Sequence, residues 1–203
     1  MRLLRKRGQI SLEFLLVFGI LLIMLLYSAR SMTFNNTSSR EALLMQVAVE
    51  EKSTANIIAS AIDQVYAQGP GSKVTVYAHF TLLRNGDYLK KAFNLTSPVI
   101  NIILAGENDP LFPAGASNSI VAVAVSNQGN EPIISGSNRT GVWVQTFLKY
   151  NATSHTRFEV NFTPSTLPPV MKVVVEWNPA QPISLVYNST SSTLHINIRV
   201  KGS

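Results

Sequence analysis

Residues 5–27 read RKRGQISLEFLLVFGILLIMLLY, in which a basic run, a small residue and one carboxylate lead into a long apolar segment. Apolar residues fill nearly every position from Ile10 to Ala29. A helix of about 20 apolar residues covers the ~30 Å hydrocarbon core of a bilayer. The pattern therefore predicts a transmembrane helix over residues 9–29.

The N-terminal basic side chains predict how this helix is oriented. Four of them precede the apolar segment, namely Arg2, Arg5, Lys6 and Arg7. By the positive-inside rule they keep the N-terminus in the cytoplasm, so we expect a single-pass protein with its C-terminal bulk outside the cell. Three fates of the N-terminus compete: a signal peptide cut after the apolar run, a retained anchor, and a cut before the run. Residues 27–31, YSARS, form a poor small-x-small cleavage site, which argues against the first.

Glu13 is an unusual residue at the head of an apolar helix. A carboxylate in a membrane helix costs roughly 2.5–3.5 kcal/mol at mid-bilayer and less near the interface, so a partner is expected. A cut between Gly8 and Gln9 would create a cationic amine one helical turn from Glu13. The two groups could pair within one chain or between neighbouring chains. Alternatively, Glu13 lies at headgroup level, where the helix dipole favours an anion.

Gly8 and the following QISLEF, residues 9–14, come directly after the basic run, and this order resembles the class III signal peptide of archaeal type IV pilin-like proteins. The resemblance implies that a prepilin peptidase cuts between Gly8 and Gln9, so that residues 1–8 are a cleaved basic leader. It also implies that the helix after the cut packs with other copies of the chain, or with related pilins, in the core of a helical filament. Glu13 would then help to set the register of neighbouring subunits.

The expected function is accordingly that of a structural subunit of an archaeal type IV pilus-like surface filament, with a role in adhesion or surface attachment. The protein would reside in the membrane before assembly and in an extracellular cell-surface filament afterwards. The alternative is a single membrane-anchored extracellular β-sandwich binding module. The two hypotheses differ in the N-terminus and in the assembly state.

The composition fits an exported domain. The chain has 203 residues, 46% of them hydrophobic, and no Cys, so a domain with a proper core is expected but no disulfide. The formal net charge is +6, but four of the 17 basic side chains lie in residues 1–7. The remainder carries 13 basic and 11 acidic side chains, a balance of +2. We therefore expect no nucleic-acid partner.

A helical pattern continues after the apolar segment. Apolar residues recur at three- and four-residue steps, namely Leu44, Val47, Ala48, Ala55, Ile58, Ile62 and Val65. Most of the charged residues are expected on the opposite, solvated face, namely Glu50, Glu51, Lys52 and Asp63. We predict one N-terminal helix over residues 9–68 whose second half is amphipathic and packs on the chain's own domain or on neighbouring helices.

Two features predict the bounds of this second half. Ser38 and Glu41 form a capping box that could start a second helix, with a kink or break near residues 34–39. Gln68 is followed by Gly-Pro-Gly, which ends the helical part because Gly suits a C-cap and Pro cannot continue a helix.

From residue 72 onward the apolar pattern has a period of two. Strands at Lys73–Leu83 and Tyr88–Phe93 flank Asn85-Gly86, which predicts a tight hairpin turn. Further strands are expected at Pro98–Ala105, Ser119–Ser126, Gly141–Tyr150, Thr156–Phe162, Val170–Trp177, Ile183–Tyr187 and Thr193–Val200. The predicted fold class is therefore α+β, a long N-terminal helix followed by an extracellular antiparallel β-sandwich domain in residues 72–203.

Motifs for catalysis are absent from the sequence. The three histidines, His79, His155 and His195, are far apart, and no nucleophile elbow, phosphate loop, zinc motif or dinucleotide fingerprint occurs. Glu107, Asn108 and Asp109 have the oxygen ligands of a calcium site, but a turn is the better interpretation. We expect no catalytic residues, no metal and no cofactor, so the chain is not predicted to be an enzyme.

N-glycosylation sequons are the one surface signal. Seven occur, at Asn35, Asn36, Asn94, Asn138, Asn151, Asn161 and Asn188. Asn138, Asn151 and Asn188 lie in expected loops and are the best candidates, whereas Asn161 lies in an expected strand. The sequence thus predicts a glycoprotein.

Overall fold

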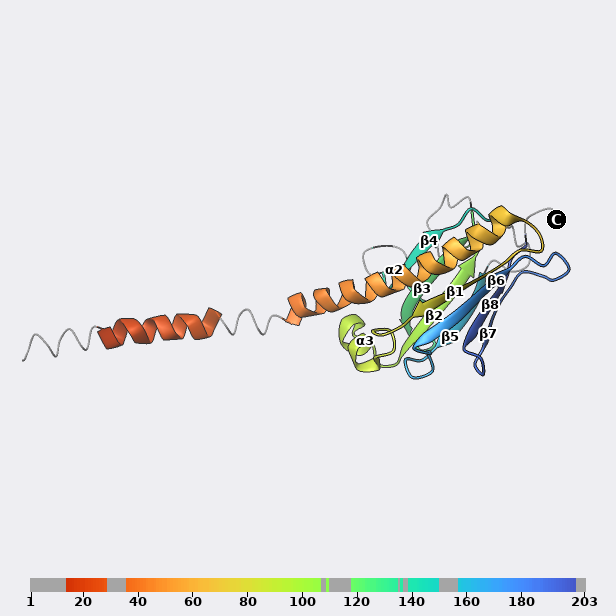
Figure 1. The fold of residues 1–203 in the computed structure, drawn as a ribbon. Coiled ribbons are helices and arrows are strands. Elements are labelled where there is room, and N and C mark those ends of the chain that lie inside the picture. Colours follow the sequence, from red (N-terminus) through yellow and green to blue (C-terminus); the bar gives the residue numbers. More distant parts are fainter. Residues whose placement is uncertain are drawn as a thin grey trace, which may run out of the picture. The chain divides into compact units, whose positions relative to one another are not determined.

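The computed structural model describes residues 14–28, 36–106, 109, 118–134, 136, 139–149 and 157–199, with the side chains of residues 36–38 excepted. The chain divides into two compact units, Met1–Glu41 and Ala42–Ser203. A helix over residues 14–28 belongs to the first unit, and α2 (Asn36–Gln68) begins there. The second unit holds the rest of α2, a short helix and eight strands (Figure 1).

The helix over residues 14–28 carries an uninterrupted apolar surface. Its large apolar side chains, from Phe14 to Tyr27, are 43% to 76% exposed. The rings of Phe14 and Phe18, one turn apart, stack with their centroids 6.2 Å from each other. Within the described part of the chain, no helix is both long and apolar enough to cross a membrane. The predicted transmembrane segment extends past this helix, to residues 9–13 and 29, which lie outside the described residues.

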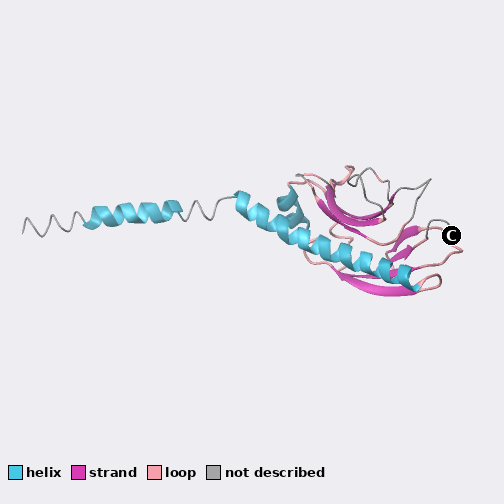
Figure 2. Cartoon of the chain, turned by 90° about the horizontal axis from the view of Figure 1, so that it is seen from above, coloured by secondary structure: helices cyan, strands magenta, loops and turns pink. Residues whose placement is uncertain are grey.

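Two four-stranded sheets lie in the second unit. The strand order in the first sheet is β1 (Lys73–His79), β6 (Val170–Glu176), β8 (Thr193–Asn197) and β7 (Ser184–Asn188). The strand order in the second sheet is β4 (Gly141–Gln145), β3 (Ile120–Asn127), β2 (Pro98–Ala105) and β5 (Arg157–Phe162). Figure 2 shows both groups of strands, with α2 running along them. An α+β fold with mainly antiparallel sheets is thus confirmed, while its finer description as a sandwich stays a prediction.

One strand pair contradicts the purely antiparallel prediction. β6 and β8 are parallel neighbours, with Val174 opposite His195. The reason is that β7 takes the edge of the sheet, and β8 folds back from it into the place between β7 and β6. The chain reverses its direction between β6 and β7 and again between β7 and β8, so β8 runs in the same direction as β6.

The predicted hairpin around Asn85-Gly86 is wrong. β1 ends at His79, and Gly86–Phe93 forms the helix α3. Asn85 caps this helix, because its Oδ1 accepts the N–H of Tyr88 at 3.1 Å. Leu89 and Ala92 are buried at a helical spacing, and Asn94 closes α3 in the left-handed conformation at φ 56°.

The apolar face of α2 is confirmed. Its fully buried members are Val47, Ala55, Ile58, Ile62 and Val65, while Leu44 and Ala48 are half-buried. The helix ends at Gln68, where Gly69 adopts φ 89° and its N–H donates to the Val65 carbonyl at 3.1 Å. No break occurs over residues 36–39, so α2 is already helical before Ser38, whereas residues 34 and 35 lie outside the described ranges.

The solvated position predicted for Glu51 is wrong. Glu51 is only 1% exposed, because it lies one turn after Val47 and one turn before Ala55 on the core-facing side of α2. Its Oε1 has no hydrogen-bond partner within the described residues. Burial, and secondarily the charge of Glu50, raises the pKa of Glu51 well above its ordinary value.

Other charged residues of α2 connect the helix to both sheets. Just past β1, the Glu50 carboxylate accepts three backbone N–H groups, of residues 81, 82 and 83, at 2.9, 2.8 and 3.3 Å. Asp63 Oδ1 accepts the N–H of Phe147 at 2.7 Å, just past β4. Lys52 Nζ donates to the carbonyl of Trp143, on β4, at 3.1 Å. β4 ends at Gln145 and is shorter than the predicted strand to Tyr150, because the regular pairing is interrupted at Phe147, whose N–H donates to Asp63, while the flanking Thr146 and Leu148 still hydrogen-bond to Ser119.

One large hydrophobic core joins α2 to the inner faces of both sheets, with Ile62, Ile102 and Val173 among its members. A smaller cluster lies on the outer face of the second sheet, formed by Ile103, Ala105, Ile120, Ala122 and Ile134. β2 and β3 are therefore apolar on both faces over most of their length. At one end of that outer face, polar side chains replace the apolar ones.

Candidate functional site

The predicted processing and assembly residues, Gly8, Gln9 and Glu13, lie outside the described residues. The helix that follows at residues 14–28 has no charged side chain. Its exposed apolar side chains are stabilised only by an apolar environment, which lipid or other apolar helices would supply. Chemically, this segment is suited to burial in an apolar environment.

The exposed face of α2 also carries apolar side chains near its start. Met45 is 71% exposed and Val49 is 65% exposed, one helical turn apart. Val47, between them in sequence, is fully buried on the opposite side. This part of α2 therefore packs on its own domain with one face and presents apolar surface with the other.

Three predicted glycosylation sites are described, and all three are exposed. Asn188 ends β7, and its Oδ1 accepts the N–H groups of Thr190 and Ser191 at 3.0 and 3.3 Å in the turn to β8. Asn94 follows α3, and Asn161 lies on the outer face of β5. Of the remaining sites, Asn35, Asn138 and Asn151 lie outside the described residues, as does the side chain of Asn36 at the start of α2.

The histidines do not form a site in the described part of the chain. His79 lies on β1 and His195 on β8, with β6 between these strands, and His155 is outside the described residues. In the segments that the structure describes, no three His, Asp or Glu side chains are grouped to hold a metal ion. Glu107 and Asn108 lie outside these segments, and the described Asp109 has its Oδ2 4.0 Å from Arg157 Nε.

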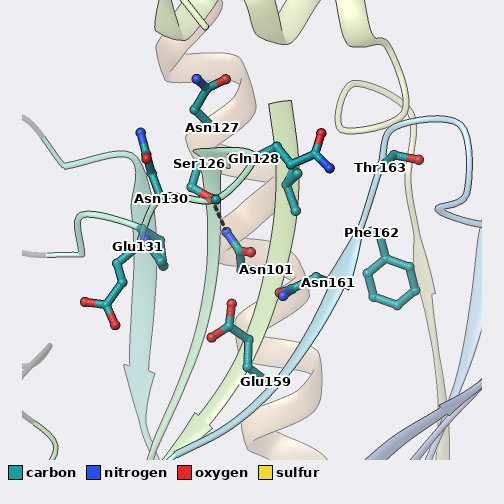
Figure 3. A pocket seen from close by; sticks show the side chains of 13 residues that line it. Asn101, Ser126, Asn127, Gln128, Asn130, Glu131, Glu159, Asn161, Phe162 and Thr163 are labelled. Carbon is teal, nitrogen blue, oxygen red and sulfur yellow. Dashed lines mark hydrogen bonds between the residues drawn. The ribbon is translucent and has the colours of Figure 1, made fainter. Parts of the chain in front are cut away.

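A polar pocket of about 440 Å³ on the outer face of the second sheet was missed by sequence reasoning. Figure 3 shows Asn101 at its centre, with Ser126 on one side and Glu159 and Asn161 on the other. Asn101 and Ser126 are 2% and 5% exposed, and Asn101 Nδ2 donates to Ser126 Oγ at 2.9 Å and to the Ala124 carbonyl at 3.3 Å. These two polar interruptions of apolar strands were the only signal, because the pocket draws on segments far apart in sequence.

Charged side chains lie along one side of this pocket. Arg157 Nη2 donates to Glu131 Oε1 at 2.8 Å, and Glu131 lines the pocket together with Glu159. The pKa of Glu159 is raised above its ordinary value, chiefly by burial and also by the charge of Glu131. The charge of Arg157 and a hydrogen bond with Asn161 offset only part of this effect. No Lys, Arg or His side chain is among the lining residues.

Residues 6–32 match the family model of the class III signal peptide. No curated protein and no solved structure matches the chain. The matched segment contains the junction of Gly8 and Gln9 as well as Glu13, the residues on which the resemblance rests. The N-terminal segment is therefore identified as a class III signal peptide, consistent with a type IV pilin-like prepilin.

Proposed function

We propose that this protein is a structural subunit of an archaeal type IV pilus-like surface filament. It is inserted in the membrane as a single-pass prepilin with a cytoplasmic N-terminus, and a prepilin peptidase cuts it between Gly8 and Gln9. The observation that carries this proposal is the class III signal peptide match over residues 6–32. The mature chain then leaves the membrane for a helical filament of its own copies or of related pilins.

The chemistry of the N-terminal helix supports assembly. Residues 14–28 expose an uncharged apolar surface, which can exchange lipid for neighbouring helices. Association of helices in lipid relies on close packing and on satisfied polar groups, and Glu13 is the polar group at the head of this helix. On α2, the exposed Met45 and Val49 are further apolar side chains that neighbouring subunits can contact.

The β-rich unit forms the outer surface of the filament in this proposal and mediates adhesion or surface attachment. A structural role requires no catalytic residue, metal or cofactor, and the near-neutral charge of the mature chain does not favour nucleic acid. We accordingly propose that the protein is not an enzyme.

Substitution of Glu13 tests the assembly step. Glu13→Ala removes the carboxylate, so we expect impaired cleavage or few filaments by electron microscopy of the cell surface. The matched control Glu41→Ala removes an exposed carboxylate outside the signal peptide segment and should assemble normally. Immunoblots of the membrane fraction verify equal amounts of both variants. Unchanged filaments in Glu13→Ala would show that the carboxylate is incidental to assembly.

The second candidate function is a single membrane-anchored extracellular binding module. The polar pocket on the second sheet is the observation that favours it, since a binding site needs no filament. The two candidate functions predict different N-terminal residues and different cross-linking patterns for the protein at the cell surface. The anchored module retains Met1 and is recovered as single chains after cross-linking at the cell surface, whereas the filament subunit starts at Gln9 and is recovered as ladders of cross-linked chains.

A further inference from the structure

We propose that the pocket on the outer face of β2, β3 and β5 binds a neutral saccharide. The pocket, about 440 Å³ in volume, falls within the size range of small-molecule sites. It lies on the side of the sheet opposite α2, because the lining residues Val99 and Asn101 on β2, and Glu159 and Asn161 on β5, alternate with side chains of the main core. These core-facing side chains are Ile100, Ile102 and Val160. Binding there depends neither on cleavage nor on assembly of the chain.

The lining offers mainly neutral donors and acceptors. It holds five side-chain amides, from Asn101, Asn127, Gln128, Asn130 and Asn161, and the hydroxyls of Ser126 and Thr163. Asn101 and Ser126 are nearly buried and bond to each other, and Asn127 Oδ1 accepts the N–H of Ser97, so mainly Gln128, Asn130 and Asn161 can present their amides to a ligand. Amides and hydroxyls both donate and accept hydrogen bonds, and a carboxylate such as Glu159 accepts several. This inventory matches the hydroxyl groups of a sugar, each of which also donates and accepts.

The charges of the pocket disfavour ionic ligands. An anion would meet Glu131 and Glu159 without a cationic side chain in the lining. A cation would find one of these two carboxylates already paired, because Arg157 Nη2 lies 2.8 Å from Glu131 Oε1. The remaining Glu159 also has Arg157 as a charged neighbour and Asn161 as a hydrogen-bond partner.

The pocket wall is held in place before any ligand binds. Asn127 Oδ1 accepts the N–H of Ser97 at 2.8 Å, and the N–H of Gln128 donates to the Ser97 carbonyl at 2.9 Å. Gly129 turns the chain at φ 84°, a conformation that favours glycine. A wall fixed in this way reduces the entropy lost on binding.

Apolar side chains complete the match to a sugar ring. Val99 and Pro132 lie in the lining and can cover the C–H groups of a pyranose. Phe162 also borders the pocket, but its ring packs edge-on against Tyr187 in the core, with centroids 4.7 Å apart. Hydrogen bonds rather than aromatic stacking therefore dominate recognition.

The test is calorimetric titration of the full chain, made in a host without N-glycosylation and kept in a detergent without a sugar headgroup. The probes are mannotriose, cellotriose, maltotriose and chitotriose, with a heparin hexasaccharide and spermidine as charged controls. We expect at least one neutral trisaccharide to bind and both charged probes to fail. Glu159→Ala and Asn161→Ala should each weaken binding about tenfold or more, since each removes hydrogen bonds to the ligand.

The matched control is Glu176→Ala, which removes a half-buried carboxylate paired with Lys73 on the first sheet and should leave affinity unchanged. Thermal melting verifies that all variants are folded. The proposal is overturned if no neutral trisaccharide binds, if Glu159→Ala and Asn161→Ala bind like the wild type, or if a charged probe binds instead.

Because Asn161 lies in a sequon, the saccharide in the pocket is either an external one or a glycan attached to the chain itself. Titration of the natively glycosylated chain distinguishes these two sources. Equal binding by the native and the unmodified chain supports an external saccharide. Binding by the unmodified chain alone, with a glycan on Asn161 in the native chain, supports the chain's own sugar as the occupant.

Discussion

At the scale of single residues, the buried carboxyl of Glu51 is an unfavourable feature of α2. It is 1% exposed and its Oε1 has no partner in the described part of the chain. A buried ionised carboxylate without hydrogen bonds is unfavourable by several kcal/mol, so the side chain binds a proton more readily in the folded state. Its raised pKa makes stability depend on pH.

The sign of this dependence follows from the protons bound in each state. Between the ordinary pKa of 4.5 and the raised folded pKa, the folded protein holds a proton on Glu51 that the unfolded chain has released. The stability that this proton supports is present below pH 4.5 and is lost as the pH rises through the folded pKa. The neutral Glu51→Gln has no such loss.

We therefore predict that Glu51→Gln is more stable than the wild type at pH 7, by about 1–3 kcal/mol. The measurement is urea unfolding of both proteins from pH 4 to 8. The difference in stability between the two proteins should narrow toward pH 4, where the wild-type carboxyl is protonated in both the folded and the unfolded state. Glu41→Gln, at an exposed position of the same helix, should change little. A stability difference of equal size at all pH values would contradict the raised pKa of Glu51.

Sequence reasoning missed Glu51 because the width of a buried helical face depends on how many partners surround the helix. The apolar spacing predicted Val47, Ala55 and Ile58 correctly. Both sheets and α2 share one core, so the buried face is wide enough to include Glu51 and Thr54 as well. The width of the buried face is set by tertiary packing, which a helical wheel drawn from the sequence does not show.

At the scale of elements, α3 shows how one dipeptide permits two structures. Asn-Gly suits a tight hairpin turn, but Asn is also a favoured N-cap. Leu89 and Ala92 are three residues apart, which is a helical spacing, and Asp87 and Lys90 form an ion pair at 3.8 Å one turn apart. The hydroxyl of Tyr88 also donates to the side chain of Gln46 on α2, a contact that the sequence could not reveal.

The cap predicts the effect of a small substitution. Asn85→Ala removes the acceptor of the Tyr88 N–H, so the protein should lose about 1 kcal/mol of stability. Asn56→Ala, at an exposed position inside α2, is the matched control and should be neutral or slightly stabilising because Ala favours helix. Thermal unfolding of the two variants decides the matter. Equal melting temperatures would argue that Asn85 does not act as a cap.

The strands were more predictable than their pairing. β2 occurs at Pro98–Ala105 as expected, since an apolar run is bounded there by polar spacers. The parallel pairing of β6 and β8 was not predictable, because it depends on which strand takes the sheet edge. The saccharide pocket was hidden for a related reason, as Asn101 and Asn161 come together only through the pairing of β2 and β5.

At the scale of the whole molecule, the exposed sequons predict a protein heavier than its chain. Asn94 and Asn188 are exposed at a helix end and at a strand end. We expect the intact mass of the native protein to exceed 22.2 kDa, the mass of the full chain, if the attached sugar outweighs the leader. Asn94→Gln and Asn188→Gln should each lower the mass by one glycan. Intact-mass spectra without any added sugar would refute glycosylation.

The central claim for the whole molecule is that the chain is processed as a prepilin. Its most direct test is the identity of the first residue of the native protein. Terminal amines are labelled, the protein is digested with a glutamate-specific protease, and the N-terminal peptide is identified by mass spectrometry. This protease is preferred to trypsin, which would itself cut after Arg7. The account predicts the peptide from Gln9 to Glu13, whereas an intact Met1, or a start near Ser31, would contradict it.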